Sequence, residues 1–207
     1  MTPQRLPPDS PTTPPVASYV SGTSDTPLKG QTIGDCFDAT VARVPDRDAL
    51  LSLHQGLRYS WRELQAEVDK TARALLAAGV VQGERVGIWA PNRAEWTITQ
   101  FATAKIGAIL VNLNPSYRTH ELEYALTQSA TATLILQGRF KASNYVQMIA
   151  ELAPELAEVQ EGGLNCPQLP ALKRVVCLDS ADALPGMLTW QGLLEGAKTV
   201  SQARLTE

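Results

Sequence analysis

Residues 83–115, GERVGIWAPNRAEWTITQFATAKIGAILVNLNP, decide the fold class. Two short apolar runs, residues 85–89 and 109–113, stand on either side of a helix-length segment from about residue 93 to 105. Strands that are almost entirely apolar are typical of parallel sheets that helices cover on both faces. The stretch therefore predicts a strand, a helix and a second strand of an α/β domain.

The same alternation continues towards the carboxyl terminus. We predict helices over about residues 119–128, 144–152 and 189–195, strands over residues 133–136 and 175–178, and a loop over residues 154–170. Together these segments predict a mostly parallel sheet flanked by helices.

A helix is predicted near the amino terminus, before the first strand of this sheet. Ile33, Phe37, Val41 and Val44 recur at helical spacing, and Thr32 is available as the N-cap. The amino-terminal residues 1–17 are rich in Pro, Ser and Thr, and half of the 14 prolines lie within residues 1–27. Because such a stretch buries too little apolar surface to offset its ordering entropy, we expect a disordered tail over residues 1–17.

A hairpin and a second helix follow. Strand-like runs at residues 49–53 and 57–59 flank a Gln-Gly turn, and residues 60–63, SWRE, have the form of a capping box. The helix that this box opens should place four apolar side chains on one face: Leu64, Val68, Ala72 and Leu75. Gly79 stands where a left-handed residue would end that helix.

Composition excludes several classes of protein. The 207 residues are 44% hydrophobic and 19% charged, which suits a globular domain, and the net charge of -3 gives no reason to expect a nucleic-acid partner. The apolar runs are too short for a transmembrane segment, and residues 1–15 lack the apolar core of a signal peptide. We therefore expect a cytoplasmic protein.

The cysteines and histidines predict neither disulfides nor a metal site. Cys36, Cys166 and Cys177 have unrelated spacings, and only His54 and His120 could join them as metal ligands. We interpret the cysteines as buried or incidental thiols in a reducing compartment. The four tryptophans fall on apolar patterns and are expected to pack in the core.

The sequence has none of the short motifs that bind phosphate or activate a serine. Gly-x-Gly-x-x-Gly, the P-loop pattern and Gly-x-Ser-x-Gly are all absent from the 207 residues. Gly79, Gly83 and Gly87 are evenly spaced, but a helix cap and a tight turn explain them better than a phosphate site does. Similarly, Glu121 and Glu123 beside His120 favour a stabilised helix amino terminus over acid–base catalysis.

One loop is a candidate for ligand contact. Residues 112–118, NLNPSYR, follow the second strand at its carboxyl end, the edge where open parallel sheets bind ligands. Two amides, a phenol and a guanidinium lie within these seven residues. The competing interpretation, which we favour, is that the asparagine side chains only hydrogen-bond the turn.

Three segments in this order resemble a known family. They are residues 57–64 (LRYSWREL), residues 83–92 with Glu95-Trp96 (GERVGIWAPN, then EW) and residues 103–115 (TAKIGAILVNLNP). They are similar to core motifs of the adenylate-forming acyl- and aryl-CoA synthetases, luciferases and peptide-synthetase adenylation domains. The resemblance runs from about residue 18 to 200 and implies a partial amino-terminal domain of the adenylate-forming fold.

Within that family, residues 112–122 resemble the fatty-acyl-CoA synthetase branch. An aryl-acid or luciferase-type relative stays a weaker alternative. The resemblance implies ATP, Mg²⁺, CoA and a fatty or other carboxylic acid as partners of the complete enzyme. Acyl-AMP and pyrophosphate would form first, and the CoA sulfur would then displace AMP.

The resemblance assigns no catalytic, cofactor-binding or metal-binding residue to this chain. The family's Ser/Thr/Gly-rich phosphate loop ending in Pro-Lys-Gly, its ribose-binding Asp and its catalytic Lys have no counterpart in the 207 residues. Attack of a carboxylate on a phosphate needs fixed cationic or N–H donors and a metal ion. We therefore expect residues 18–207 to be an incomplete AMP-binding domain, inactive alone, with a sheet face and edge uncovered. The alternative is a non-catalytic α/β binding or interaction module.

Overall fold

The computed structural model describes residues 22, 25–26, 28–158 and 163–205. The chain divides into two compact units, Met1–Gly30 and Gln31–Glu207. The described residues of the first unit form no helix or strand, and the tail predicted over residues 1–17 lies outside the described part. All helices and strands of the described residues belong to the second unit.

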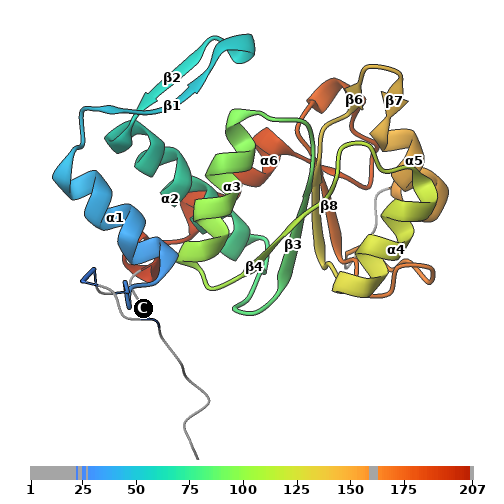
Figure 1. Cartoon of the computed structure of the whole chain (residues 1–207). Coiled ribbons are helices and arrows are strands. Elements are labelled where there is room, and N and C mark those ends of the chain that lie inside the picture. Colours follow the sequence, from blue (N-terminus) through green and yellow to red (C-terminus); the bar gives the residue numbers. More distant parts are fainter. Residues whose placement is uncertain (1–21, 23–24, 27, 159–162, 206–207) are drawn as a thin grey trace, which may run out of the picture. The chain divides into compact units, whose positions relative to one another are not determined.

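A parallel sheet forms the centre of the second unit (Figure 1). Its described strands are β3 (Arg85–Trp89), β4 (Ile109–Asn112), β5 (Thr133–Leu136), β8 (Arg174–Cys177) and β9 (Leu188–Thr189). Their order is β4-β3-β5-β8-β9, and each neighbouring pair runs parallel. Nearly every residue of β3, β5 and β8 is buried, which explains their apolar composition. The predicted α/β class and parallel sheet are confirmed.

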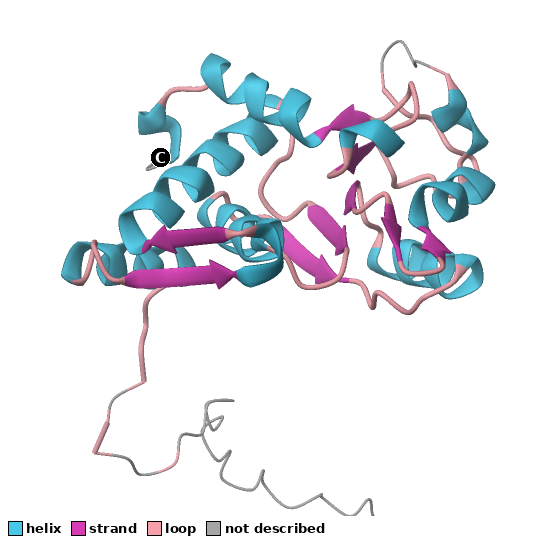
Figure 2. Cartoon of the chain, turned by 90° about the horizontal axis from the view of Figure 1, so that it is seen from above, coloured by secondary structure: helices cyan, strands magenta, loops and turns pink. Residues whose placement is uncertain are grey.

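Helices cover both faces of this sheet (Figures 1 and 2). One face carries α1 (Ile33–Arg43), α2 (Trp61–Ala77), α3 (Ala94–Lys105) and α6 (Trp190–Glu195), and the other carries α4 (Thr119–Ser129) and α5 (Tyr145–Leu152). Successive residues of β5 alternate between the two cores: Ile135 packs in the first, whereas Leu134 and Leu136 pack in the second. The expectation of an uncovered apolar sheet face is therefore wrong.

An edge of the sheet is nevertheless open. Strand β4 has β3 as its one neighbour among the described strands, and Ile109 on β4 is 52% exposed. Such an edge can pair with another strand, so this part of the expectation is confirmed. Within the described residues, no helix is both long enough and apolar enough to cross a membrane.

The predicted helix, hairpin and capping box are present before the sheet. The side chain of Thr32 accepts a hydrogen bond at the start of α1. Strands β1 (Asp48–Ser52) and β2 (Leu57–Ser60) are antiparallel and joined through the short 3₁₀ turn η1 (Leu53–Gln55) and Gly56, whose φ is 66°. Ser60 and Glu63 exchange both bonds of the capping box at the start of α2.

Several short elements were not predicted. These are the two-residue strands β6 (Arg139–Phe140), β7 (Ser143–Asn144) and β9, and the 3₁₀ turns η2 (Pro154–Ala157), η3 (Ser180–Asp182), η4 (Gly196–Thr199) and η5 (Gln202–Leu205). Segments of two to four residues are too short to show a hydrophobic period. The expectation for the tryptophans is also only partly confirmed, because Trp89 is fully buried whereas the other three are half-buried.

Two buried hydroxyls lack a hydrogen-bond partner among the described residues. They belong to Thr71 on α2 and Thr99 on α3, and both residues have no exposed surface. Thr103, one turn after Thr99, is equally buried, but its hydroxyl donates to the Thr99 carbonyl at 2.9 Å. Burying an unpaired hydroxyl costs free energy that a bonded hydroxyl largely recovers.

We predict that Thr71→Val and Thr99→Val each raise the free energy of unfolding by up to about 1 kcal/mol, because each removes an unpaired polar atom at nearly constant volume. Thr103→Val is the matched control and should lower it, because it removes a bonded hydroxyl. Urea denaturation of the purified variants measures all three. A loss of stability in Thr71→Val equal to that in Thr103→Val would contradict the prediction.

Candidate functional site

The carboxyl edge of the sheet contains a change of direction in the chain. From β3 the chain passes through α3 to β4 on one side, and then through α4 to β5 on the other side of β3. In open α/β sheets, ligands bind at such a switch point, outside the carboxyl ends of the strands. The segments that follow β3, β4, β5 and β8 therefore form the candidate site.

Arg93, just after β3, connects the ends of three strands. Its side chain is only 13% exposed. Nε and Nη2 donate to both oxygens of Glu95 at 2.8 and 3.0 Å, and Nη1 donates to Gln137 Oε1 and Asp179 Oδ1, each at 3.2 Å. Gln137 follows β5 and Asp179 follows β8, so one guanidinium fixes their relative positions. Asp179 also accepts from the backbone N–H of Gly138 at 3.0 Å.

Gln55 extends this network to the β1–β2 hairpin. Its Oε1 accepts the backbone N–H of Ala94 at 2.8 Å, and its Nε2 donates to Glu95 at 3.0 Å. Arg93 occupies the N-cap position of α3 but makes no side-chain capping bond. A glutamine 39 residues earlier in the sequence therefore caps the helix. We call Gln55, Arg93, Glu95, Gln137 and Asp179 the Arg93 network.

Charge within the Arg93 network is already compensated. Burial alone would raise the pKa of Glu95, but hydrogen bonds from Arg93 and Gln55 lower it below its ordinary value. Two carboxylates, Glu95 and Asp179, surround one guanidinium. The network therefore positions backbone segments and offers no spare cation for a phosphate. Sequence analysis missed it because its members are distant in sequence, although the Arg-x-Glu pair after a strand was a usable signal.

Two stacked aromatic rings hold the candidate loop over residues 112–118. The rings of Trp89 and Tyr145 lie 4.1 Å apart between centroids. Trp89 Nε1 donates to the carbonyl of Asn114 at 3.0 Å, and the Tyr145 hydroxyl donates to the carbonyl of Pro115 at 2.6 Å. Consecutive carbonyls of the loop are thus fixed by donors that come from β3 and α5. Burial raises the pKa of Tyr145, so the hydroxyl keeps the proton that it donates.

The side chain of Asn114 stabilises the turn in this loop. Asn114 Oδ1 accepts from the backbone N–H of Ser116 at 2.9 Å, as the favoured interpretation expects. Asn112 is exposed, and exposed Arg118 donates to the hydroxyl of Ser143 at 3.0 Å. Ligand contact by the loop stays a prediction, with these two side chains facing solvent.

The other acidic candidates and the histidines have structural surroundings. Glu121 Oε2 accepts the backbone N–H of Arg118 at 3.0 Å, and hydrogen bonds from the Glu121 and Arg118 backbone lower its pKa. Glu123 accepts from Gln168 at 2.9 Å. His54 and His120 are exposed. No group of three or more His, Cys, Asp or Glu side chains is placed to hold a metal ion in the described part of the chain.

The cysteines and glycines also match their structural interpretations. Burial raises the pKa of the Cys166 and Cys177 thiols, which keeps them protonated and unreactive. Gly79 and Gly83 have φ values of 82° and 77°, as a helix end and a turn require. A Cβ on Gly87 would lie 3.1 Å from Thr131, so close packing explains this glycine.

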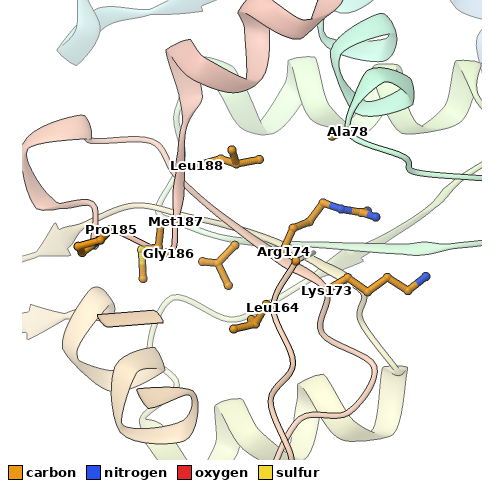
Figure 3. A pocket seen from close by; sticks show the side chains of 10 residues that line it. Ala78, Leu164, Lys173, Arg174, Pro185, Gly186, Met187 and Leu188 are labelled. Atoms are coloured by element: carbon orange, nitrogen blue, oxygen red, sulfur yellow. The ribbon is translucent and has the colours of Figure 1, made fainter. Parts of the chain in front are cut away.

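A hollow of about 500 Å³ lies at the opposite end of β8 (Figure 3). Its lining is mostly apolar and includes Met187 and Leu188. The nitrogen ends of Lys173 and Arg174 point away from these residues, and both bind Glu84, at 2.8 and 2.6 Å. Because its cations are engaged and it lies at the amino end of β8, this hollow is a weaker candidate than the carboxyl edge.

We predict that Tyr145→Phe lowers the free energy of unfolding by about 1 kcal/mol, because it removes the hydrogen bond to Pro115 and keeps the ring. Tyr124→Phe is the control, since Tyr124 is 68% exposed, and it should change stability little. Urea denaturation provides the comparison. Equal effects of the two variants would show that the Tyr145 hydroxyl does not hold the loop.

We predict a pH-dependent contribution from Glu95. Because its pKa in the folded chain is lowered from 4.5, its stabilisation is complete above that value and is lost as the pH falls below it. Glu95→Gln should therefore cost about 2 kcal/mol at pH 7, and the difference from the unmodified chain should shrink towards acid pH. Asp46→Asn is the control, because Asp46 is 83% exposed in its pair with Arg62. A difference that does not depend on pH would refute this assignment.

Comparison with known proteins places this scaffold in a family. A family profile described as AMP-binding enzyme matches residues 37–198. The mouse protein "Medium-chain acyl-CoA ligase ACSF2, mitochondrial" is 39% identical over 91% of this chain, and its zebrafish (Danio rerio) counterpart is 38% identical over 97%. The chain spans 30% and 32% of the lengths of these two relatives.

Solved structures show the same fold. The anthranilate CoA ligase AuaEII in complex with anthranoyl-AMP matches with a TM-score of 0.66 and 22% identity, over 86% of this chain and 30% of that one. A Mycobacterium tuberculosis fatty acyl CoA synthetase matches with a TM-score of 0.62 and 17% identity, over 83% of this chain and 29% of that one. With the family match over residues 37–198, these findings show that the chain belongs to the AMP-binding enzyme family and has acyl-CoA ligases as its relatives.

Proposed function

We propose that these residues belong to an acid–thiol ligase that uses ATP to convert a medium-chain carboxylic acid into its CoA thioester through an acyl-adenylate. The identity of 39% to a medium-chain acyl-CoA ligase over 91% of the chain carries this proposal. The chain spans 30% of the length of that relative, so the activity is proposed for a larger protein that contains these 207 residues. The acid, ATP, Mg²⁺ and CoA are the proposed partners.

We further propose that the 207 residues do not catalyse the reaction by themselves. Adenylate formation brings a carboxylate towards a polyphosphate, so it needs several fixed cationic or N–H donors. The 207 residues contain no Ser/Thr/Gly-rich loop ending in Pro-Lys-Gly, and Arg93 at the carboxyl edge is already paired with two carboxylates. We therefore propose that the described residues supply the scaffold of the site and that the phosphate-binding donors lie elsewhere in the larger protein.

A non-catalytic interaction module is the second candidate function. It is favoured by the coverage of both sheet faces, since a chain that lacked an essential core layer would leave one face apolar and exposed. The DNA downstream of the codon for Glu207 discriminates between the two. A reading frame that continues into a Gly/Ser/Thr-rich loop followed by Lys favours the ligase, whereas a stop codon and unrelated sequence favour the module.

We propose a cytoplasmic location, on the basis of composition and of three cysteines at unrelated spacings. The names of the two relatives place those proteins in mitochondria. Fractionation of cells that express the larger protein distinguishes the two compartments.

We predict that the purified 207-residue chain shows no acid-dependent exchange of pyrophosphate into ATP with saturated acids of medium chain length, whereas the larger protein shows it. Pyrophosphate exchange measures adenylate formation, which does not need CoA. It therefore tests the step for which the absent cationic and N–H donors are required. Acid-dependent exchange by the 207 residues would refute their inactivity. If the larger protein shows no exchange with any of the acids, the ligase proposal itself fails.

A further inference from the structure

A continuous series of hydrogen bonds runs from the β1–β2 hairpin to the carboxyl end of β8. Ser52 Oγ donates to Gln55 Oε1 at 2.6 Å, and Gln55 Nε2 donates to Glu95 Oε2 at 3.0 Å. Arg93 Nε donates to the same oxygen of Glu95 at 2.8 Å, and Arg93 Nη1 donates to Asp179, which lies just after β8. The hairpin, which is not part of the parallel sheet, is therefore joined to the carboxyl edge of that sheet.

The two ends of the Gln55 side chain make separate contacts. Oε1 accepts the backbone N–H of Ala94 at 2.8 Å and so caps α3, whereas Nε2 binds the carboxylate of Glu95 at 3.0 Å. Gln55 is half-buried, which reduces the competition of water for these bonds. Because the cap needs only an acceptor and the link to Glu95 needs only a donor, one substitution can remove the link and keep the cap.

The Glu95 carboxylate sets the orientation of the Arg93 guanidinium. Arg93 Nε and Nη2 bind the two Glu95 oxygens at 2.8 and 3.0 Å, which is the bidentate geometry that fixes a planar guanidinium. The remaining nitrogen, Nη1, binds Gln137 and Asp179 at 3.2 Å each, the upper end of the usual range of N–H···O distances. A small rotation of the guanidinium would therefore break its bonds to the segments after β5 and β8. Gln55 holds the carboxylate that prevents this rotation.

We propose that Gln55 is a positioning residue of the proposed ligase, because by holding Glu95 it keeps the segments after β3, β5 and β8 in the arrangement that adenylate formation requires. This inference rests on the proposed function. Gln55 acts through Glu95 and Arg93 and takes no part in bond making. The approach of a carboxylate to a phosphate is sensitive to placement, since an error of about 1 Å can cost about 100-fold in rate. A loosened edge disturbs the transition state more than the binding of each substrate, so the loss appears in kcat more than in KM.

The substitution Gln55→Glu separates the link to Glu95 from the helix cap. The new carboxylate still accepts the N–H of Ala94, but it has no donor for Glu95 and places a second negative charge beside it. Gln65→Glu is the matched control, because Gln65 Nε2 donates to Asp38 at 2.7 Å in the same way, between α2 and α1. Gln55→Met removes both bonds of Gln55 without adding charge, and it serves as the second variant.

Hydrogen exchange of the 207-residue chain measures whether the effect of Gln55 reaches the carboxyl edge. The informative amide is that of Gly138, which donates to Asp179 at 3.0 Å and so lies at the other end of the series. Both Gln55 variants should raise its exchange rate about tenfold relative to the central amides of β5, a typical strength of coupling between two sites. Gln65→Glu should leave this ratio unchanged. The same ratio in the Gln55 variants and in Gln65→Glu would overturn the proposal.

Pyrophosphate exchange by the larger protein tests the functional part of the proposal, under conditions in which urea denaturation shows each variant to be folded. Both Gln55 variants should lower kcat about tenfold and leave KM for ATP and for the acid within about twofold, whereas Gln65→Glu should leave both constants unchanged. An unchanged kcat in the Gln55 variants, with or without a raised KM, would overturn the proposal. If the unmodified larger protein shows no exchange, the proposed function fails, and the Gly138 amide still decides whether the hairpin is coupled to the edge.

Discussion

The largely buried guanidinium of Arg93 constrains the carboxyl edge of the sheet. A charge that is withdrawn from water must be matched by hydrogen-bond acceptors, or it costs several kcal/mol. The chain supplies these acceptors from Glu95 on α3, Gln137 after β5 and Asp179 after β8. Glu95 lies in the first turn of α3, and the other two acceptors lie just after their strands, so pairing one charge fixes three backbone segments. Gln55 then connects the β1–β2 hairpin to the same group.

Two groups of hydrogen bonds fix the loops at the carboxyl edge of the sheet. The stacked pair of Trp89 and Tyr145 fixes the loop after β4 in the same way that Arg93 fixes the neighbouring segments. Both groups of interactions are internally satisfied, so they determine where a ligand could lie without reacting with it.

Sequence periodicity predicted the regular elements well, because their burial is local and repetitive. Strand β5 was predicted with its observed bounds, and the capping box at Ser60 identified the start of α2. The Asn114 side chain bonds the turn, as the favoured interpretation had it. These features depend on residues within four positions of one another, so the sequence displays them directly.

The carboxyl-edge networks could not be predicted in the same way. Gln55 caps a helix 39 residues away, and Arg93 meets Asp179 across 86 residues. No repeating pattern in the sequence indicates either pair, because each pair depends on how the strands are ordered in the sheet. The uncovered sheet face was wrongly expected for a related reason: helices α4 and α5 complete the second layer within this chain. The β6–β7 hairpin has strands of only two residues, below the length at which alternation is visible.

Native-state hydrogen exchange tests most directly whether the edge is preassembled in this chain. The informative amides are those of Ala94 and Gly138, which donate to the side chains of Gln55 and Asp179. If the edge is one unit with the sheet, both should exchange about as slowly as the central amides of β3 and β5. Exchange of both at the rate of an unstructured peptide, while the strands remain protected, would contradict the account.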